Sequence, residues 1–430
     1  MKRRAFRAAA LTLEIVERRR VSFDKAFLEA LGRVGGSGYG RLAYDYALLG
    51  ILHYRAADRA LSLEGLENTP LRRRCAFRVA YGILKCETGL GVEDVASMCG
   101  GLLSKRMLEA LRRHRAISLD DLVGGLPEME RIAIRYSVPT WLVERLARYL
   151  GRRELERLLK ALARRILWVR ANTLRAKVDD VAKKLMRIAK VKRDRDYDFM
   201  FEILEGHERV LSSTILERGE AVVHDKASTI VVDALSPEAG EIVLDMAAAP
   251  GIKTSLISQL TSDSALVVAA DVSTTRTLEM RRLLARLGVR NAHPLVADST
   301  RMAYGRSFDR VLLDAPCSNT GAIATDPGLR ISLREEERVS KFVKIQRELL
   351  RAAISAVKRG GCVVFSTCSL LPEEGELVVE RVASELGLDL ETSGVPGSPG
   401  YRGFRISERV KRLFPHRNRT AGFFVAKICT

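Results

Sequence analysis

The chain has 430 residues, more than a single compact core usually organises, so two or three domains are expected. Hydrophobic residues make up 47% of the sequence and charged residues 29%, which suits folded domains with sizeable cores. No stretch approaches the roughly 18 uninterrupted apolar residues of a membrane span. The basic start at residues 1–4 leads into an amphipathic helical pattern rather than a signal peptide. These features argue against a membrane protein and predict a cytoplasmic one.

The chain is strongly basic. Its 72 Lys and Arg residues exceed 53 Asp and Glu residues, for a net charge of +19, and residues 1–150 alone hold 26 basic against 17 acidic residues. Such an excess predicts a polyanionic partner, with RNA or DNA as the first candidates. The seven cysteines include no CxxC pair and the six histidines show no metal-ligand spacing, so neither a disulfide framework nor a metal site is expected.

Residues 1–160 are predicted to be helical. Apolar residues recur at three- and four-residue spacing in four stretches, 42–61, 71–84, 92–103 and 141–150, and no β-rich run interrupts them. Basic clusters such as Arg72-Arg73-Arg74 lie within this pattern. We expect a small helical bundle that binds nucleic acid.

The sequence pattern changes over residues 161–235, where it predicts a small, highly charged α+β segment. The run 166–170 is typical of a strand and 178–189 of a helix, and further short strands are predicted at 210–215 and 221–223.

Residues 236–430 alternate between predicted strands and predicted helices. The strands are 242–246, 266–271, 293–297, 310–314, 362–366 and 423–428, and the helices are 254–259, 275–287, 334–358 and 373–385. This alternation predicts a parallel, doubly wound sheet. Ligands of such sheets bind at the carboxyl ends of the strands, so chemistry is expected there.

The first three strands of this region each end at an aspartate, namely Asp245, Asp271 and Asp298. A loop of small residues follows Asp245 and leads into a helix, whose free N–H groups can bind a carboxylate or phosphate. A carboxylate at the second strand end is placed for ribose hydroxyls. The alternative is that these aspartates only cap the following helices. Because GxxxxGK[ST] and GxGxxG are both absent, the predicted nucleoside cofactor is S-adenosylmethionine rather than ATP or NAD.

Two cysteines follow the next two strands, Cys317 after Asp314 and Cys368 after Ser366. Adjacent strand ends would place both in one crevice. Carbon 5 of cytosine is a poor nucleophile, but a thiolate that adds to carbon 6 turns it into an enamine-like carbon able to attack a methyl group. A second group must then remove the proton from carbon 5, and a carboxyl group near the ring nitrogen would assist. The alternative is a pair of buried structural cysteines.

Several motifs together carry a family likeness, and they occur in order over about residues 125–430. They are Tyr136-Ser137-Val138-Pro139, Trp168-Val169-Arg170-Ala171-Asn172, His224-Asp225-Lys226-Ala227-Ser228, Ala248-Ala249-Pro250-Gly251, Asp314-Ala315-Pro316-Cys317-Ser318, Ser366-Thr367-Cys368-Ser369 and Gly422-Phe423-Phe424-Val425-Ala426. With these motifs the chain resembles the RsmB/Nop/Sun group of RNA 5-methylcytosine methyltransferases. The helical front is similar, more weakly, to the NusB-like RNA-binding domain of the RsmB branch.

The resemblance implies a fold in three parts: a NusB-like helical RNA-binding domain at 1–160, a small α+β RNA-binding segment at 161–235 and a Rossmann-like class I methyltransferase domain at 236–430. It implies that Cys368 attacks the base, Cys317 assists product release and Asp314 contacts the cytosine ring. The implied S-adenosylmethionine pocket comprises Ala247, Ala248, Ala249, Pro250, Gly251, Ile252, Lys253, Asp271, Arg276, Asp298 and Asp314.

The sequence departs from the family loop, which commonly reads Cys-Ala-Ala-Pro-Gly-Gly-Lys, at two positions. Ala247 replaces the cysteine and Ile252 replaces the second glycine. The β-branched side chain of Ile252 bears on the affinity for the cofactor, not on the identity of the cofactor. His224 stands where the family often has glutamine.

Three functions remain open at this point. The first is methylation of cytosine carbon 5 in structured RNA, with ribosomal RNA favoured and transfer RNA possible, by a monomer that uses neither metal nor membrane. The second is an RNA-binding ribosome assembly factor with an idle methyltransferase domain, against which the complete set of Asp271, Asp298, Asp314, Cys317 and Cys368 argues. The third is a DNA cytosine methyltransferase, against which the cysteine of the Thr-Cys motif argues.

Overall fold

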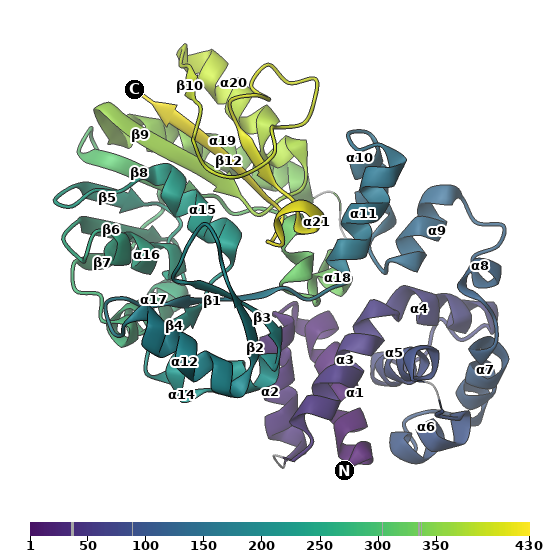
Figure 1. The fold of residues 1–430 in the computed structure, drawn as a ribbon. Helices are drawn as coiled ribbons and strands as arrows, with labels where there is room; N and C mark the ends of the chain where they lie inside the picture. Colours follow the sequence, from purple (N-terminus) through teal and green to yellow (C-terminus); the bar gives the residue numbers. More distant parts are fainter. Residues whose placement is uncertain (36–37, 88, 303, 334–335, 337) are drawn as a thin grey trace. The chain divides into compact units, whose positions relative to one another are not determined.

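A computed structural model describes residues 1–35, 38–87, 89–302, 304–333, 336 and 338–430 (Figure 1). The chain divides into two compact units. The helical unit comprises residues 1–165 and 326–336, and the mixed unit comprises residues 166–325 and 337–430. Among the described helices, none combines the length and apolar character required to cross a bilayer.

The helical unit confirms the prediction of an all-helical front for its described residues. On α1 the buried residues Phe6, Ala9, Leu13 and Val16 recur at helical spacing and face the core. The predicted helix at 42–61 is two helices that divide at His53. The helices are α1 (Lys2–Arg19), α2 (Phe23–Val34), α3 (Gly40–Leu52), α4 (Tyr54–Leu63), α5 (Leu71–Cys86), α6 (Val92–Cys99), α7 (Lys105–Arg115), α8 (Leu119–Leu122), α9 (Glu128–Arg135), α10 (Thr140–Ala147) and α11 (Arg152–Leu162).

A short stretch from the second half of the sequence completes the helical unit. It contains α18 (Leu329–Ser332), whose Ile331 belongs to the apolar core of the unit. The buried guanidinium of Arg330 donates to the carbonyl of Ser137 at 3.1 Å and to the carbonyl of Leu162. The carboxylate of Asp326 accepts from the amide of Phe23 at 2.9 Å. Both polar and apolar contacts therefore place residues 326–336 in this unit.

The mixed unit begins with a four-stranded antiparallel sheet in the order β2-β3-β1-β4. Its elements are β1 (Leu167–Ala171), α12 (Val178–Ile188), β2 (Lys190–Arg193), β3 (Met200–Glu205), α13 (His207–Leu211), α14 (Thr214–Glu217) and β4 (Ala221–Val223). The strand predicted at 210–215 is wrong, because α13 and α14 occupy this stretch and bury Val210 and Ile215. The sequence pattern missed β2, which is polar and largely exposed at the sheet edge, and β3.

The larger sheet has the order β10-β12-β9-β8-β5-β6-β7, with β11 beside β12. Its strands are β5 (Ile242–Asp245), β6 (Leu266–Asp271), β7 (Ala292–Val296), β8 (Phe308–Asp314), β9 (Val357–Thr367), β10 (Leu390–Glu391), β11 (Lys411–Leu413) and β12 (Phe423–Cys429). Strands β5 to β9 pair in parallel, as predicted, but β12 runs antiparallel to β9. The prediction of a wholly parallel sheet is therefore wrong at this edge, because an apolar run does not reveal the direction of a strand.

Helices cover both faces of the larger sheet. On β8 the neighbours Leu312 and Leu313 belong to two different cores, Leu312 with α15 and α16, and Leu313 with α19 and α20. Val364 and Phe365 on β9 alternate in the same way, which confirms the doubly wound architecture. The helical elements are α15 (Lys226–Leu235), α16 (Ile252–Leu260), α17 (Thr274–Leu287), η1 (Thr320–Ala324), α19 (Arg338–Ala356), η2 (Pro372–Glu374), α20 (Glu376–Leu386) and α21 (Pro415–Asn418). Residues 334, 335 and 337 at the start of the predicted helix 334–358 lie outside the described residues.

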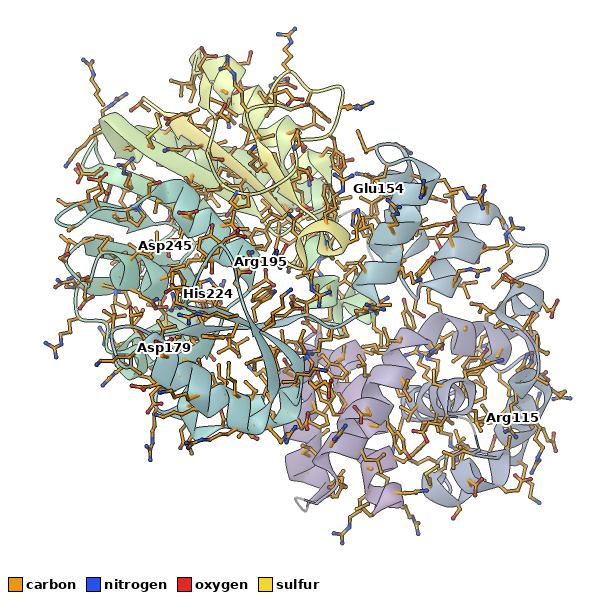
Figure 2. All side chains as sticks on the ribbon, in the orientation of Figure 1. Arg115, Glu154, Asp179, Arg195, His224 and Asp245 are labelled. Carbon is orange, nitrogen blue, oxygen red and sulfur yellow. A yellow bond between two sulfur atoms is a disulfide. The ribbon has the colours of Figure 1, made fainter. Side chains whose placement is uncertain are left out.

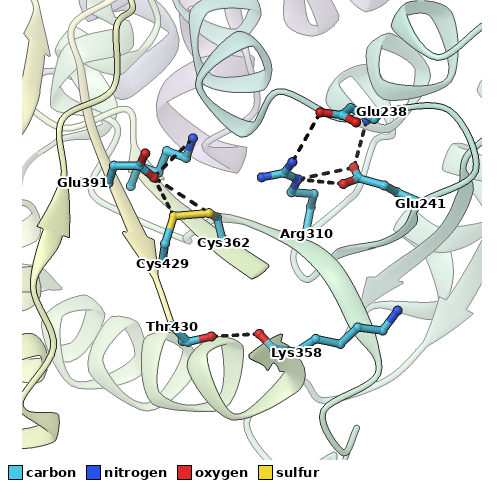
Figure 3. Close-up of a disulfide and its surroundings, with 9 residues drawn as sticks. Glu238, Glu241, Arg310, Lys358, Cys362, Glu391, Cys429 and Thr430 are labelled. Atoms are coloured by element: carbon cyan, nitrogen blue, oxygen red, sulfur yellow. Dashed lines mark hydrogen bonds and ion pairs between the residues drawn. A yellow bond between two sulfur atoms is a disulfide. The ribbon is translucent and has the colours of Figure 1, made fainter. Parts of the chain in front are cut away.

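A disulfide joins Cys362 on β9 to Cys429 on β12 (Figure 3). The sequence predicts no disulfide framework and does not reveal this single pair. The two residues are 67 positions apart in the sequence, but they are direct partners across the antiparallel pair and their Cα atoms lie 4.1 Å apart. The pairing of β9 with β12 brings the two cysteines together, and this pairing cannot be inferred from two cysteines so far apart in the sequence. Nearby, the Thr430 hydroxyl donates to the Lys358 carbonyl at 2.8 Å, which also holds the end of the last strand.

Candidate active site

Neighbouring parallel strands bring the two predicted cysteines together. Asp314 on β8 lies opposite Ser366 on β9, and the loops after these residues carry Cys317 and Cys368. The two sulfur atoms lie 3.2 Å apart. Cys317 is buried and Cys368 is partly exposed, so Cys368 is the thiol that a large substrate can reach.

Asp314 is held by two neighbours. Its carboxylate accepts from the ammonium of Lys253 at 2.6 Å and from the hydroxyl of Ser366 at 2.7 Å. Burial has the largest single effect and would lower the pKa of Lys253. The Asp314 carboxylate, together with Cys368 and Asp245, outweighs it, so the net shift is upward. The ammonium therefore stays charged at neutral pH. It also lies 5.5 Å from the ring centroid of Phe423. Lys253, predicted from the cofactor loop, contacts the carboxylate beside the cysteines.

The Cys317 thiol holds its proton firmly. Its hydrogen bond with Cys368, and then its burial, raise the pKa of Cys317 well above the usual range. At neutral pH Cys317 is therefore a thiol that can share a proton with the sulfur of Cys368.

A buried carboxylate that the sequence prediction missed ties the two cysteine loops together. Glu374 follows Cys368 by six residues and is fully buried in η2. It accepts from the amide of Ser318 at 2.8 Å, from the hydroxyl of Ser369 at 2.6 Å and from the side chain of Gln346 at 3.2 Å. Burial raises its pKa. The only sequence signal was an acidic pair after the Thr-Cys motif, which also suits a helix start.

A second missed residue, Asn319, contacts both thiols. Its carboxamide oxygen accepts from Cys368 at 2.8 Å and from Cys317 at 3.7 Å.

The loop between β5 and α16 is fixed by the strand-end aspartates. Asp245, labelled in Figure 2, accepts from the Thr254 hydroxyl at 2.7 Å. Asp271 accepts from the amide of Ala249 at 3.3 Å, and the guanidinium of Arg276 donates to the carbonyl of Ala249. The predicted pocket residues Ala249, Asp271 and Arg276 thus lie in one cluster of polar contacts.

Gly251 ends this loop in the left-handed region, at φ +98°. A Cβ atom here would lie 2.8 Å from Cγ of Met280 on α17, so both the backbone and the space favour glycine. Ile252, the departure from the family pattern, lines a hollow of about 540 Å³ with Val223, Leu283 and Arg286.

Asp298 lies after β7, next in the sheet. Its carboxylate accepts from the amide and the hydroxyl of Thr300, at 3.0 and 2.6 Å, and these bonds lower its pKa. Like Asp245 and Asp271, it has a local partner, but the capping alternative does not hold for the first two: the N-cap of α16 is Gly251 and that of α17 is Ser273. The side chain of Val272, directly after Asp271, is an apolar group that is 68% exposed. The strand ends therefore combine carboxylates with an apolar surface, which suits a nucleoside.

Comparisons with known proteins point to one family. Residues 232–429 match the model described as 16S rRNA methyltransferase RsmB/F. The tRNA (cytosine(72)-C(5))-methyltransferase of Pyrococcus horikoshii is 35% identical over 217 residues, which are 49% of this chain and 53% of that protein. The probable ribosomal RNA small subunit methyltransferase B of Bacillus subtilis is 27% identical over 387 residues, 85% of this chain and 80% of that protein.

Relatives differ in how much of their length the chain spans. It covers 27 to 41% of the length of three large rRNA (cytosine-C(5))-methyltransferases, those of Mus musculus, Homo sapiens and Caenorhabditis elegans. The crystal structure of PH0851 superposes with a TM-score of 0.83 over 100% of this chain and 99% of that chain, at 27% identity. The fold is therefore shared over the whole length of the chain.

The buried Asp245 predicts a pH-dependent stability. Burial raises its pKa from 3.8 to about 7, so the folded state binds the proton more tightly than the unfolded state. The contribution of this carboxyl group is most favourable below pH 3.8 and is lost as the pH rises toward 7. Asp245→Asn should therefore gain stability relative to the wild type between pH 4.5 and 8, by at most about 4 kcal/mol, measured by urea unfolding.

Asp309→Asn is the matched control. Hydrogen bonds from Lys358 and Ile242 lower the pKa of Asp309, so its carboxylate stabilises the fold above the unfolded pKa of 3.8 and loses this contribution only as the pH falls below it. Asp309→Asn should therefore be less stable than the wild type by nearly the same amount at pH 4.5 and at pH 8. An Asp245→Asn difference that is equal at pH 4.5 and pH 8 would contradict a raised pKa.

Glu374 predicts a second outcome. Glu374→Ala leaves the donors of Ser318, Ser369 and Gln346 without their acceptor and should cost about 3 kcal/mol of unfolding free energy. Glu374→Gln keeps the shape and one acceptor oxygen and should cost less. Urea unfolding measures both, and iodoacetamide labelling of Cys317, followed by peptide mass spectrometry, should rise in the alanine variant only. Equal stability and labelling in the two variants would show that Glu374 does not hold the loops.

Proposed function

We propose that this chain, whose residues 232–429 match the RsmB/F family of rRNA methyltransferases, methylates carbon 5 of a cytosine in RNA with S-adenosylmethionine as the donor. The observation that carries the proposal is the pair of thiols 3.2 Å apart, beside the ion pair of Lys253 with Asp314. This combination supplies a reachable nucleophile, a second thiol with a proton and a charged pair for the pyrimidine ring.

The strand ends fit S-adenosylmethionine, which supplies an electrophilic methyl group when bound. The amides at the start of α16 suit its carboxylate. Asp271 suits the ribose hydroxyls, Asp298 suits the adenine amino group, and the exposed Val272 offers an apolar surface to the adenine ring. Residues 247–253 and Arg276 form the rest of this pocket in the proposal.

In the proposed reaction the thiolate of Cys368 forms a bond to carbon 6, and the π electrons of the ring move to carbon 5. Carbon 5 then takes the methyl group of bound S-adenosylmethionine, whose methyl–sulfur bond breaks to leave S-adenosylhomocysteine. The ammonium of Lys253 would offset the negative charge that develops on the ring, and Asp314 would contact the ring while it holds that ammonium in place. Release requires loss of the proton from carbon 5 and cleavage of the carbon–sulfur bond. Cys317 gives its proton to the departing sulfur and takes the proton from carbon 5, so its own protonation is restored.

The helical unit offers a surface for the RNA backbone. A hollow of about 490 Å³ is lined by Arg4, Arg7, Arg33 and Arg72, with Glu14 as its acidic residue. Arg4, Arg7 and Arg72 have no acidic partner among the described residues. Apolar side chains such as Leu11 and Leu102 also line it. Cations around an apolar surface suit the phosphates and bases of an unpaired RNA segment.

Small-subunit ribosomal RNA is the favoured substrate. The Bacillus subtilis relative, whose name specifies this RNA, matches most of both chains, whereas the Pyrococcus horikoshii relative, named for a transfer RNA, matches about half of each. The proposal retains a cytoplasmic monomer that works without a metal.

The central test is methylation of total host RNA with labelled S-adenosylmethionine, together with a gel for covalent protein–RNA adducts. We expect the wild type to form 5-methylcytosine, Cys368→Ala to lose at least about a thousandfold in rate, as nucleophile removal does, and Cys317→Ala to accumulate an adduct. Cys86→Ala, which removes an exposed thiol of the helical unit, is the control and should remain active.

Full activity of Cys368→Ala would overturn the nucleophile assignment. RNA binding by a wild type that never transfers a methyl group would favour the assembly factor instead.

The arginine hollow predicts a change in the salt dependence of RNA binding. Replacing Arg4, Arg7 and Arg72 with Gln should weaken binding and reduce the slope of log K against log[salt] by about 2, at about 0.7 for each phosphate contact. Fluorescence anisotropy with a labelled small-subunit rRNA transcript measures both. The same change at the exposed Arg148, Arg153 and Lys160 is the control. Equal losses in the two triple variants would show a general charge effect rather than a site.

A further inference from the structure

Asn319 lies between the two cysteine loops and contacts both sulfur atoms. It follows Cys317 by two residues, and its carboxamide oxygen lies 2.8 Å from the sulfur of Cys368 and 3.7 Å from that of Cys317. None of the roles derived above for the methyltransfer uses this side chain.

The backbone fixes where this carboxamide lies. Asn319 has φ +61° and ψ +21°, in the left-handed region that glycine and asparagine tolerate best. It precedes η1, where the amide of Ala322 donates to its carbonyl at 3.0 Å. The amide of Gly321 donates to the carbonyl of Cys368 at 3.0 Å, so η1 is bonded to the second cysteine loop. The side chain is therefore anchored against Cys368 by the turn that carries it.

Turn geometry alone does not account for the contact. Glycine adopts this backbone conformation without strain, so a position that served only the turn would gain nothing from a carboxamide. Asparagine keeps the turn and adds one acceptor and two donors beside the thiols.

We propose that Asn319 is a positioning residue that sets the orientation and the protonation of the Cys368 thiol. The oxygen accepts from the thiol, as observed. Rotation of the amide about its last side-chain bond presents the N–H group to the thiolate instead. Both protonation states of Cys368 thus find a partner without movement of the backbone. The role in methyl transfer rests on the proposed function, whereas the effect on the thiol does not.

Other charged and titratable groups also act on this pair of thiols. The ammonium of Lys253 on α16 interacts favourably with Cys368, Asp314 at the end of β8 pairs with that ammonium, and Cys317 shares a hydrogen bond with Cys368. Glu374 in η2 opposes ionisation of Cys317. All of these groups remain in place when only residue 319 is changed, so substitutions there isolate the carboxamide.

The test is the rate of iodoacetamide labelling of Cys368 between pH 6 and 10, resolved by peptide mass spectrometry on the full chain. Asn319→Asp keeps the shape, but its carboxylate can only accept and repels a thiolate. We expect the midpoint of its labelling profile to rise by about one pH unit. Asn319→Gly keeps the turn and removes the donor, and we expect severalfold slower labelling at pH 7. The exposed Cys86, read in the same samples, is the internal control and should not change.

Each result decides the proposal. Unchanged profiles in both variants would overturn it, and so would an equal shift at Cys86. If the aspartate variant fails to fold by its thermal unfolding curve, the glycine variant decides alone. Methyl transfer by Asn319→Asp should recover partly at pH 9 relative to pH 7, which a general structural defect would not cause. Shifted labelling in a chain whose wild type transfers no methyl group would retain the role of Asn319 and reject the proposed function.

Discussion

The parallel pairing of β8 with β9 is the constraint on which the candidate site depends. Parallel neighbours end at the same edge of the sheet, so the loops that carry Cys317 and Cys368 meet there. Strand β5 lies on the other side of β8 and delivers Lys253 through its loop and α16. Strands β6 and β7 continue the same edge with Asp271 and Asp298. The strand order β9-β8-β5-β6-β7 thus runs from the thiols at one end to Asp271 and Asp298, the strand ends of the proposed nucleoside pocket, at the other.

Buried polar contacts then hold these loops in place. Glu374 joins the loops of β8 and β9 through Ser318 and Ser369, while Lys253 joins the loop of β5 to Asp314. Glu374 is fully buried, whereas the side chains of Lys253 and Asp314 are 14% and 25% exposed. A buried polar group without its partner is costly, so the bonds of Glu374 constrain the loops most strongly. The loops are therefore held by few but specific bonds, and among the described groups around the thiols Cys368, Asp314 and Asn319 are partly or fully exposed.

The sequence predicts most of the sheet because its strands are apolar runs separated by helical patterns, and it predicts the cysteines because their motifs follow strand ends. It does not reveal features that depend on pairing across the fold. The polar edge strand β2, the reversed direction of β12 and the bond of Cys362 to Cys429 are of this kind. Glu374 and Asn319 were missed for a related reason, since an acidic pair and an asparagine acquire meaning only from the sulfur and hydroxyl groups that folding places beside them.

Residues 326–336 have a consequence for how the two units can be separated. The chain passes between them at 165, at 325 and at 336, so a single cut yields no intact unit. A fragment ending at 165 lacks Ile331 and the guanidinium of Arg330, which caps carbonyls of its helices. The complementary fragment contains Ile331 but lacks the helices whose apolar core buries it. Recombination between relatives that exchanged the helical front would have to transfer this stretch as well, so residues 1–165 and 326–336 are expected to be inherited together.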